Sequence, residues 1–91
     1  MGDLIKGKKA VKDLCAAIGK TQRDIAAMYD TNDSIVSNRV KRGYYDNPGN
    51  FARLVDDLGY KLNFDIKIGV YDHEGNFVSD VAVNTDYLME D

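Results

Sequence analysis

Four polar side chains in the middle of the sequence fall at the spacing of one face of an α-helix. They lie at i, i+3, i+4 and i+7, and they are Ser34, Ser37, Asn38 and Lys41. An asparagine amide can pair in bidentate fashion with adenine, a serine hydroxyl can contact several bases, and a lysine ammonium suits a phosphate. A face that only contacts water has the same composition. The chemistry of this stripe therefore depends on the elements that position it.

The chain offers little for catalysis or for metal binding. Its single histidine, His73, falls in a turn-forming cluster, and its single cysteine, Cys15, falls on an apolar helix face. No Ser/His/Asp or Cys/His set can be assembled without His73, which has no evident partner pattern. We therefore expect no enzyme, and neither a metal nor another cofactor.

Length and charge indicate one domain with two unlike parts. The 91 residues leave room for a single small core, and the net charge is −3. Residues 1–59 carry ten Lys and Arg against eight Asp, whereas residues 60–91 carry two Lys against seven Asp and Glu. No secretory signal or membrane-spanning run is recognisable, so we expect a cytoplasmic protein with no membrane partner.

Apolar spacing predicts four helices in the first two-thirds of the chain. The first has Val11, Leu14, Cys15 and Ile18 on one face and ends at Gly19. Thr21 and Asp24 have the spacing of a capping box for a second, short helix. Asn32 is a good N-cap for a third helix, which turns Val36 and Val40 inward and stops at Gly43. After an expected loop over 44–50, the fourth helix buries Phe51, Leu54, Val55 and Leu58 and ends at Gly59.

The apolar period then changes from 3.6 to 2. This pattern predicts one long strand over 62–70, a turn over 72–76 and a return strand over 77–83. The expected fold is mainly α with a C-terminal β-hairpin: a four-helix domain over 1–60, a two-stranded antiparallel extension over 61–85, and an acidic tail over 86–91.

The predicted hairpin has more apolar surface than a lone pair of strands can protect. A two-stranded hairpin is marginal in water, and a second copy of the chain could cover it by pairing edges. We therefore expect a homodimer, although the hairpin could instead fold back onto its own helices. The expected dimer contacts are Phe64, Ile66, Ile68, Val70, Phe77, Val81 and Val83.

Residues 21–43 resemble the helix-turn-helix of the lambda-repressor-like, or Cro/XRE, family. The second helix begins Thr21-Gln22 and continues to Tyr29, and the third closes in the sequence SNRVKRG over 37–43. The sequence LGYKL over 58–62 is also similar to the segment that follows the fourth helix in the family. The resemblance covers roughly residues 8–62, and it implies the four-helix fold of that family.

The resemblance implies a homodimer that binds a palindromic double-stranded DNA operator, with the third helix in the major groove. It implies a transcriptional repressor of bacterial or phage origin, with no small-molecule substrate. Base contacts would come from Asp33, Ser34, Ser37 and Asn38. Phosphate contacts would come from Thr21, Gln22, Arg23, Lys41 and Arg42.

Two departures from the family pattern leave an alternative open. Asp30 stands where a glycine usually makes the turn, and Asp33 places an acid where phosphate would be repelled. The alternative is a protein-interaction or inhibitor module that keeps the helical fold and uses its acidic hairpin to bind a protein partner.

Two further groups of side chains have two possible roles. Tyr44 and Tyr45 suit either the core, which we favour, or the DNA backbone. The lysines near the start of the first helix are equally compatible with a solvated surface and with phosphate contacts, and they are Lys6, Lys8, Lys9 and Lys12.

Overall fold

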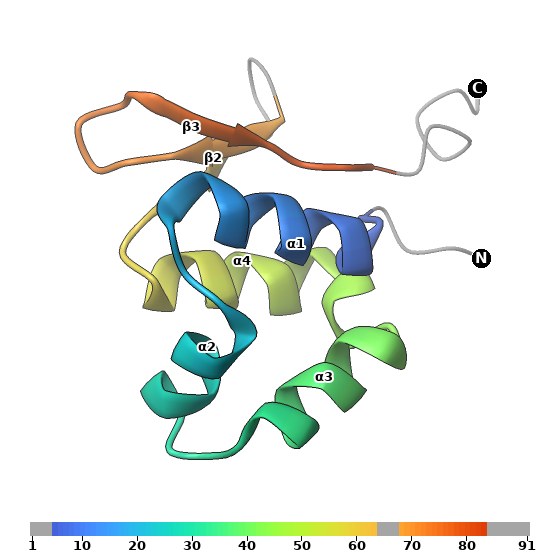
Figure 1. The fold of residues 1–91 in the computed structure, drawn as a ribbon. Helices are drawn as coiled ribbons and strands as arrows, with labels where there is room; N and C mark the ends of the chain where they lie inside the picture. The colour runs from blue at the N-terminus through green and yellow to red at the C-terminus, as the bar shows by residue number, and fades with distance from the viewer. Residues whose placement is uncertain (1–4, 64–67, 84–91) are drawn as a thin grey trace, which may run out of the picture.

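The computed structural model describes residues 5–63 and 68–83 of the chain. Its helices are α1 (Gly7–Ile18), α2 (Gln22–Met28), α3 (Asp33–Lys41), the short 3-10 helix η1 (Tyr44–Asp46) and α4 (Pro48–Asp57). Its strands are β1 (Lys61–Asn63), β2 (Gly69–Tyr71) and β3 (Phe77–Asp80). The sheet lies over α1 at one end of the molecule, and α2 and α3 form the other end (Figure 1). The chain is therefore mainly helical with a C-terminal antiparallel sheet, as the sequence pattern predicts.

The capping residues expected from the sequence are found where α1 ends and where α2 and α3 begin. Gly19 adopts a left-handed conformation after α1, with φ of 70°. Thr21 and Asp24 form the complete capping box of α2, and the Asn32 side chain accepts a hydrogen bond from the backbone N–H of Ile35 at the start of α3. Asp30, in the turn between α2 and α3, has φ of 56°, a conformation that aspartate tolerates better than most residues. The turn is therefore made without the usual glycine.

The prediction of a loop over 44–50 is wrong in part. Tyr44–Asp46 forms η1, and α4 already begins at Pro48. Proline is favoured in the first turn of a helix, where its missing N–H costs nothing, and the Asn47 side chain caps that turn by accepting from the N–H of Asn50. The proline that suggested a loop therefore starts the helix.

The prediction of one continuous strand over 62–70 is also wrong. β1 and β2 pair antiparallel with Leu62 opposite Val70, so the chain reverses between them. β2 also pairs with β3, which gives a three-stranded sheet of order β1-β2-β3 in place of the expected two-stranded hairpin. A period of 2 is the same in one long strand and in two short ones, and the third strand pairs an edge that a two-stranded hairpin leaves open.

The sheet packs onto the helices of its own chain. Val70 is fully buried and Val81 is 7% exposed, both within the core built around Phe51, Leu14 and Ile25. Ile68 and Val83 pack partly against this core, whereas Phe77 is 45% exposed. Phe64 and Ile66, the other two expected dimer contacts, lie outside the described residues. Of the expected dimer contacts that the structure describes, Phe77 therefore offers the most surface to a second copy.

The start of α1 is fastened to two distant parts of the chain. Ile5 forms an antiparallel bridge with Val83. The backbone N–H of Gly7 donates to Oδ1 of Asp46 over 2.8 Å. A Cβ on Gly7 would lie 2.6 Å from the Tyr45 carbonyl carbon, so only glycine allows this approach. Tyr45 itself is 2% exposed, which confirms its expected place in the core, whereas the same expectation is wrong for Tyr44, which is 45% exposed.

Within the described residues, none of the helices is long and apolar enough to cross a membrane.

Candidate nucleic-acid interface

The inner face of α3 fixes which of its side chains point outward. Val36 is fully buried and Val40 is 6% exposed, as expected from their i, i+4 spacing. The preceding α2 is held to α4 by the Tyr29 hydroxyl, which donates to Oδ2 of Asp57 over 2.5 Å. Because Val36 and Val40 face the core, the opposite face of α3 is exposed to solvent, at the end of the molecule farthest from the sheet (Figure 1).

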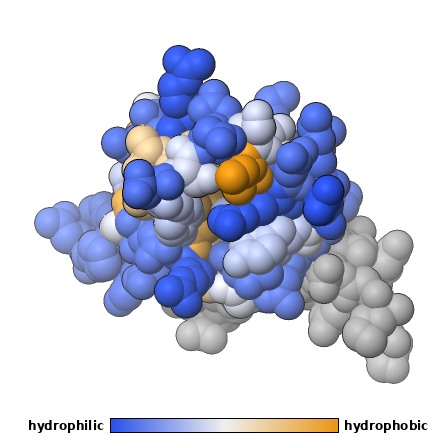
Figure 2. Space-filling view, turned by 90° about the horizontal axis from the view of Figure 1, so that it is seen from below, coloured by the Kyte–Doolittle hydropathy of each residue, from blue (hydrophilic) through white to orange (hydrophobic). Residues whose placement is uncertain are grey.

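The expected base-contacting residues come together on this outer face. Ser34 and Asn38 are exposed, Ser37 is partly buried, and all three line one shallow hollow together with Asp33 and Lys41. Among the described residues, the structure gives no hydrogen-bond partner to the side chains of Ser34, Ser37 or Asn38. Seen from this end, the surface is mostly hydrophilic (Figure 2). These donors and acceptors are therefore available to an external partner.

A second hollow adjoins the first and contains a side chain that sequence analysis missed. It is lined by Ile35, Asn38, Arg39, Arg42, Gly43 and Tyr44. Ile35 is 41% exposed although it is strongly apolar. Its position one residue before the buried Val36 was the available signal, because that offset of about 100° turns it away from the core. An exposed apolar side chain here could contact a thymine methyl group.

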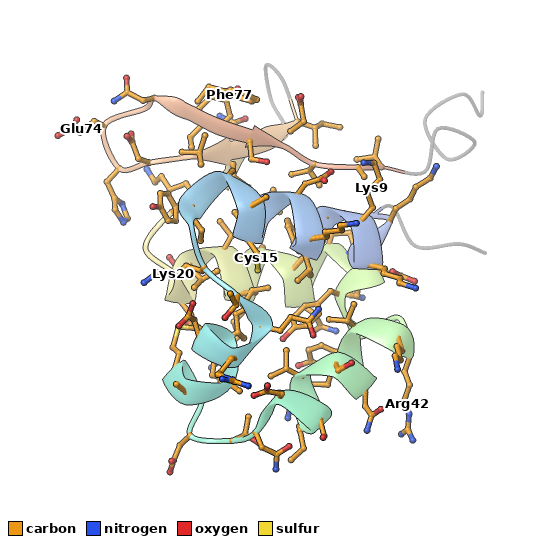
Figure 3. The ribbon with its side chains drawn as sticks, viewed as in Figure 1. Lys9, Cys15, Lys20, Arg42, Glu74 and Phe77 are labelled. Atoms are coloured by element: carbon orange, nitrogen blue, oxygen red, sulfur yellow. The ribbon has the colours of Figure 1, made fainter. Side chains whose placement is uncertain are left out.

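The cations in this second hollow are held in different ways. The guanidinium of Arg39 lies 5.5 Å from the centre of the exposed Tyr44 ring. Arg42, an expected phosphate contact, extends from the C-terminal end of α3 (Figure 3). This side of the outer face therefore carries two arginines.

A third hollow borders the outer face on its other side. It is lined by Lys8, Lys12, Cys15, Ala16, Lys20, Gln22, Ser37, Val40 and Lys41. The expected phosphate contacts Gln22 and Lys41 therefore share one surface with lysines of α1. Burial, with a smaller contribution from Asp24, raises the pKa of the Cys15 thiol, so this side chain stays uncharged at neutral pH.

The other two expected phosphate contacts are already engaged within the protein. The Thr21 hydroxyl accepts from the backbone N–H of Asp24 and donates to its carboxylate, so it serves the capping box. Nε of Arg23 lies 3.3 Å from Oδ2 of Asp33, one of the expected base-contacting residues. Of the five expected phosphate contacts, Gln22, Lys41 and Arg42 are therefore the ones whose side chains are less engaged within the protein.

No protein-family model matches the chain, and neither a curated protein nor a solved structure matches it. Within the described residues, no group of three or more His, Cys, Asp or Glu side chains could hold a metal ion. A function is therefore inferred from α3 and the surfaces that flank it.

Proposed function

We propose that the protein binds double-stranded DNA in a sequence-specific manner, with α3 in the major groove, as the resemblance to the Cro/XRE helix-turn-helix family implies. The observation that carries this proposal is the outer face of α3. Three of its polar side chains, Ser34, Ser37 and Asn38, have no hydrogen-bond partner among the described residues, and cationic side chains flank the face on both sides.

The dimensions of an α-helix suit this role. With its side chains a helix such as α3 is about 10–12 Å in diameter, and the major groove is about 12 Å wide. Ser34, Ser37 and Asn38 would then contact base edges. Lys41 and Arg42, at the end of the helix, would contact phosphates on opposite sides of the groove.

The distribution of charge supports the same orientation, because residues 21–43 carry four Lys and Arg against three Asp. Residues 68–83 contain three Asp and Glu and no Lys or Arg, and they belong to the end of the molecule away from α3 (Figure 1). Glu74 lies at the outer tip of the sheet (Figure 3). With α3 in the groove, these acids remain remote from the phosphates, where they would otherwise weaken binding.

The proposal includes a homodimer that represses transcription by occupying a palindromic operator in a bacterium or a phage. Two copies of α3 would enter successive major grooves about 34 Å apart. Phe77, which is 45% exposed on the sheet, is the side chain through which a second copy would make contact in this dimer. Sedimentation of wild-type protein and of the Phe77→Lys variant measures this directly, and a wild-type monomer at every concentration would refute the dimer.

The first experiment is capture of genomic DNA fragments by the purified protein at about 150 mM salt, a concentration that suppresses weak electrostatic binding. We expect a two-fold symmetric motif among the retained sequences. The double variant Ser34→Ala/Asn38→Ala should lose this enrichment. A matched control, Asp56→Ala/Lys61→Ala, also leaves the net charge unchanged and removes two exposed side chains elsewhere, so it should retain the motif.

No enrichment by a folded wild-type protein would refute DNA binding. The alternative is then a protein-interaction module that uses the acidic sheet, and the exposure of Phe77 between acidic residues favours that alternative.

A further inference from the structure

We propose that the lysine-lined hollow between α1, α2 and α3 binds the phosphate backbone of one nucleic-acid strand, so that the DNA-binding surface extends from α3 onto α1. This inference rests on the proposed function and goes beyond it, because it assigns a role to lysines outside the helix-turn-helix segment. The four lysines of this surface are Lys8, Lys12, Lys20 and Lys41.

Three separate elements bring these ammonium groups to one surface. Lys8 and Lys12 are one turn apart on α1, about 6 Å along its axis. Lys20 lies in the connection between α1 and α2, and Lys41 is the last residue of α3. All four side chains are exposed. The cluster therefore results from the fold and not from a run of lysines in the sequence.

The charge of this surface is balanced only in part within the protein, by Asp24, which interacts electrostatically with Lys20. No aspartate or glutamate lines the hollow in the part of the chain that the structure describes. The nearby Asp13 pairs with Lys9 over 3.2 Å, and the carboxylate of Asp24 accepts hydrogen bonds from Thr21 in the capping box. When these lysines neutralise the phosphates of a polyanion, its condensed counterions are released into solution, and this release favours binding.

The remaining lining groups also suit phosphate oxygens. Gln22 and Ser37 supply an amide and a hydroxyl that can donate hydrogen bonds. Cys15 and Val40, both less than 10% exposed, contribute uncharged groups to the lining. A bound phosphodiester would therefore meet donors and cations, and no carboxylate among the described lining residues.

The position of the hollow identifies the occupant as the same duplex that α3 contacts. Ser37 and Lys41 line both this hollow and the outer face of α3, so the two surfaces are continuous. A helix that lies in the major groove is bordered on each side by a sugar-phosphate strand. The strand on the α1 side would then pass over Lys8 and Lys12.

The salt dependence of binding to a random-sequence duplex tests this inference, because phosphate contacts carry no sequence information. Each phosphate contact contributes about −0.9 to the slope of log K against log salt concentration. We expect the slope of the Lys8→Gln/Lys12→Gln variant to be less negative by about 2, and its affinity for the random duplex to fall. The motif recovered from genomic fragments should stay the same.

A charge-matched control separates this effect from a general loss of positive charge. Lys9→Gln/Lys61→Gln removes two lysines that do not line the hollow, and its slope should stay close to that of the wild type. The variant Lys8→Arg/Lys12→Arg keeps both charges and should keep the slope. Circular dichroism and thermal melting of all three variants would detect a loss of fold.

The possible failures differ from one another. If folded wild-type protein binds neither the random duplex nor any genomic fragment, both the proposed function and this inference are refuted. If the wild type binds DNA and the slope of Lys8→Gln/Lys12→Gln equals that of the control, only the α1 surface is refuted.

Discussion

Arg23 and Asp33 form an ion pair that joins the first turn of α2 to the first turn of α3. Nε of Arg23 is 3.3 Å from Oδ2 of Asp33, and the two side chains are 83% and 54% exposed. Asp33 is the acid that departs from the Cro/XRE pattern, at a position where a negative charge also benefits the N-terminus of a helix. Its pairing partly neutralises an acid on the face that we propose to contact DNA.

The variant Asp33→Asn should bind a random-sequence duplex several-fold more tightly. It removes a negative charge from the DNA-facing surface and releases Arg23 for a phosphate. The free energy of unfolding should change by less than about 1 kcal/mol, because exposed ion pairs contribute little. Titration of labelled duplex measures the affinity, and Asp56→Asn on the outer face of α4 is the control. Weaker binding to the genomic motif alone would instead assign Asp33 a direct base contact.

The end of α1 and the starts of α2 and α3 could be predicted because their causes are local. Thr21 and Asp24 form the capping box of α2, and the Asn32 side chain accepts a hydrogen bond from the N–H of Ile35. Both partners of each hydrogen bond are therefore only three residues apart in the sequence. The reversal between Leu62 and Val70 had no such local signature. It depends on pairing across the sheet, and the alternation of apolar residues is identical with or without it.

The candidate site was predictable to a similar extent. The outer stripe of α3 follows from helical spacing, since Val36 and Val40 fix the buried side. The surface formed by Lys8, Lys20 and Lys41 was not predictable, because it requires knowing how α1 lies against α3. Tertiary packing decides that arrangement, and helical periodicity contains no information about it.

Gly7→Ala should destabilise the protein strongly. The new Cβ would lie 2.6 Å from the Tyr45 carbonyl carbon and 2.7 Å from the Asp46 nitrogen, and backbone atoms cannot rotate away as a side chain can. We expect a loss of about 2–3 kcal/mol in the free energy of unfolding, as for overpacking elsewhere. Urea denaturation measures it. Gly49→Ala is the control, because its Cβ would meet only the Asn47 side chain; equal losses in both variants would contradict the prediction.

Thr21→Ala should reduce stability at neutral pH more than at acidic pH. Hydrogen bonds from the backbone and hydroxyl of Thr21 hold the pKa of Asp24 below its ordinary value of 3.8. A lowered pKa in the folded state stabilises the protein above that ordinary value, and the benefit is lost as the pH falls through the lowered one. Thr21→Ala removes the hydroxyl part of this benefit, whereas Thr21→Ser keeps it. Denaturation curves at several pH values should show the wild type and Thr21→Ala converging in acid.

Tyr29→Phe should make the protein less sensitive to alkali. Burial, together with the hydrogen bond to Asp57, raises the pKa of the Tyr29 hydroxyl well above its ordinary value of 10.0. Above that value the unfolded chain releases the proton and the folded chain keeps it, so the free energy of unfolding falls as the pH rises. Removing the hydroxyl abolishes this contribution and costs about 1 kcal/mol at neutral pH.

Melting curves of Tyr29→Phe between neutral and alkaline pH measure both effects. Tyr60→Phe is the matched control, because among the described residues the structure shows no hydrogen bond from the Tyr60 hydroxyl. Parallel alkaline losses in the wild type and Tyr29→Phe would show that the Tyr29–Asp57 bond does not contribute.

The bridge between Ile5 and Val83 has a consequence for the order in which the chain folds on the ribosome. Helices α1 to α4 leave the ribosome before β3, yet β3 packs on α1 and Lys6 donates its N–H to the Ala82 carbonyl. A contact between such distant positions closes late, since the whole intervening chain must already be synthesised. A nascent chain halted before β3 would expose the apolar side of α1. We infer that translation products of this protein that end before β3 are substrates for proteases, because the apolar side of α1 stays uncovered in them.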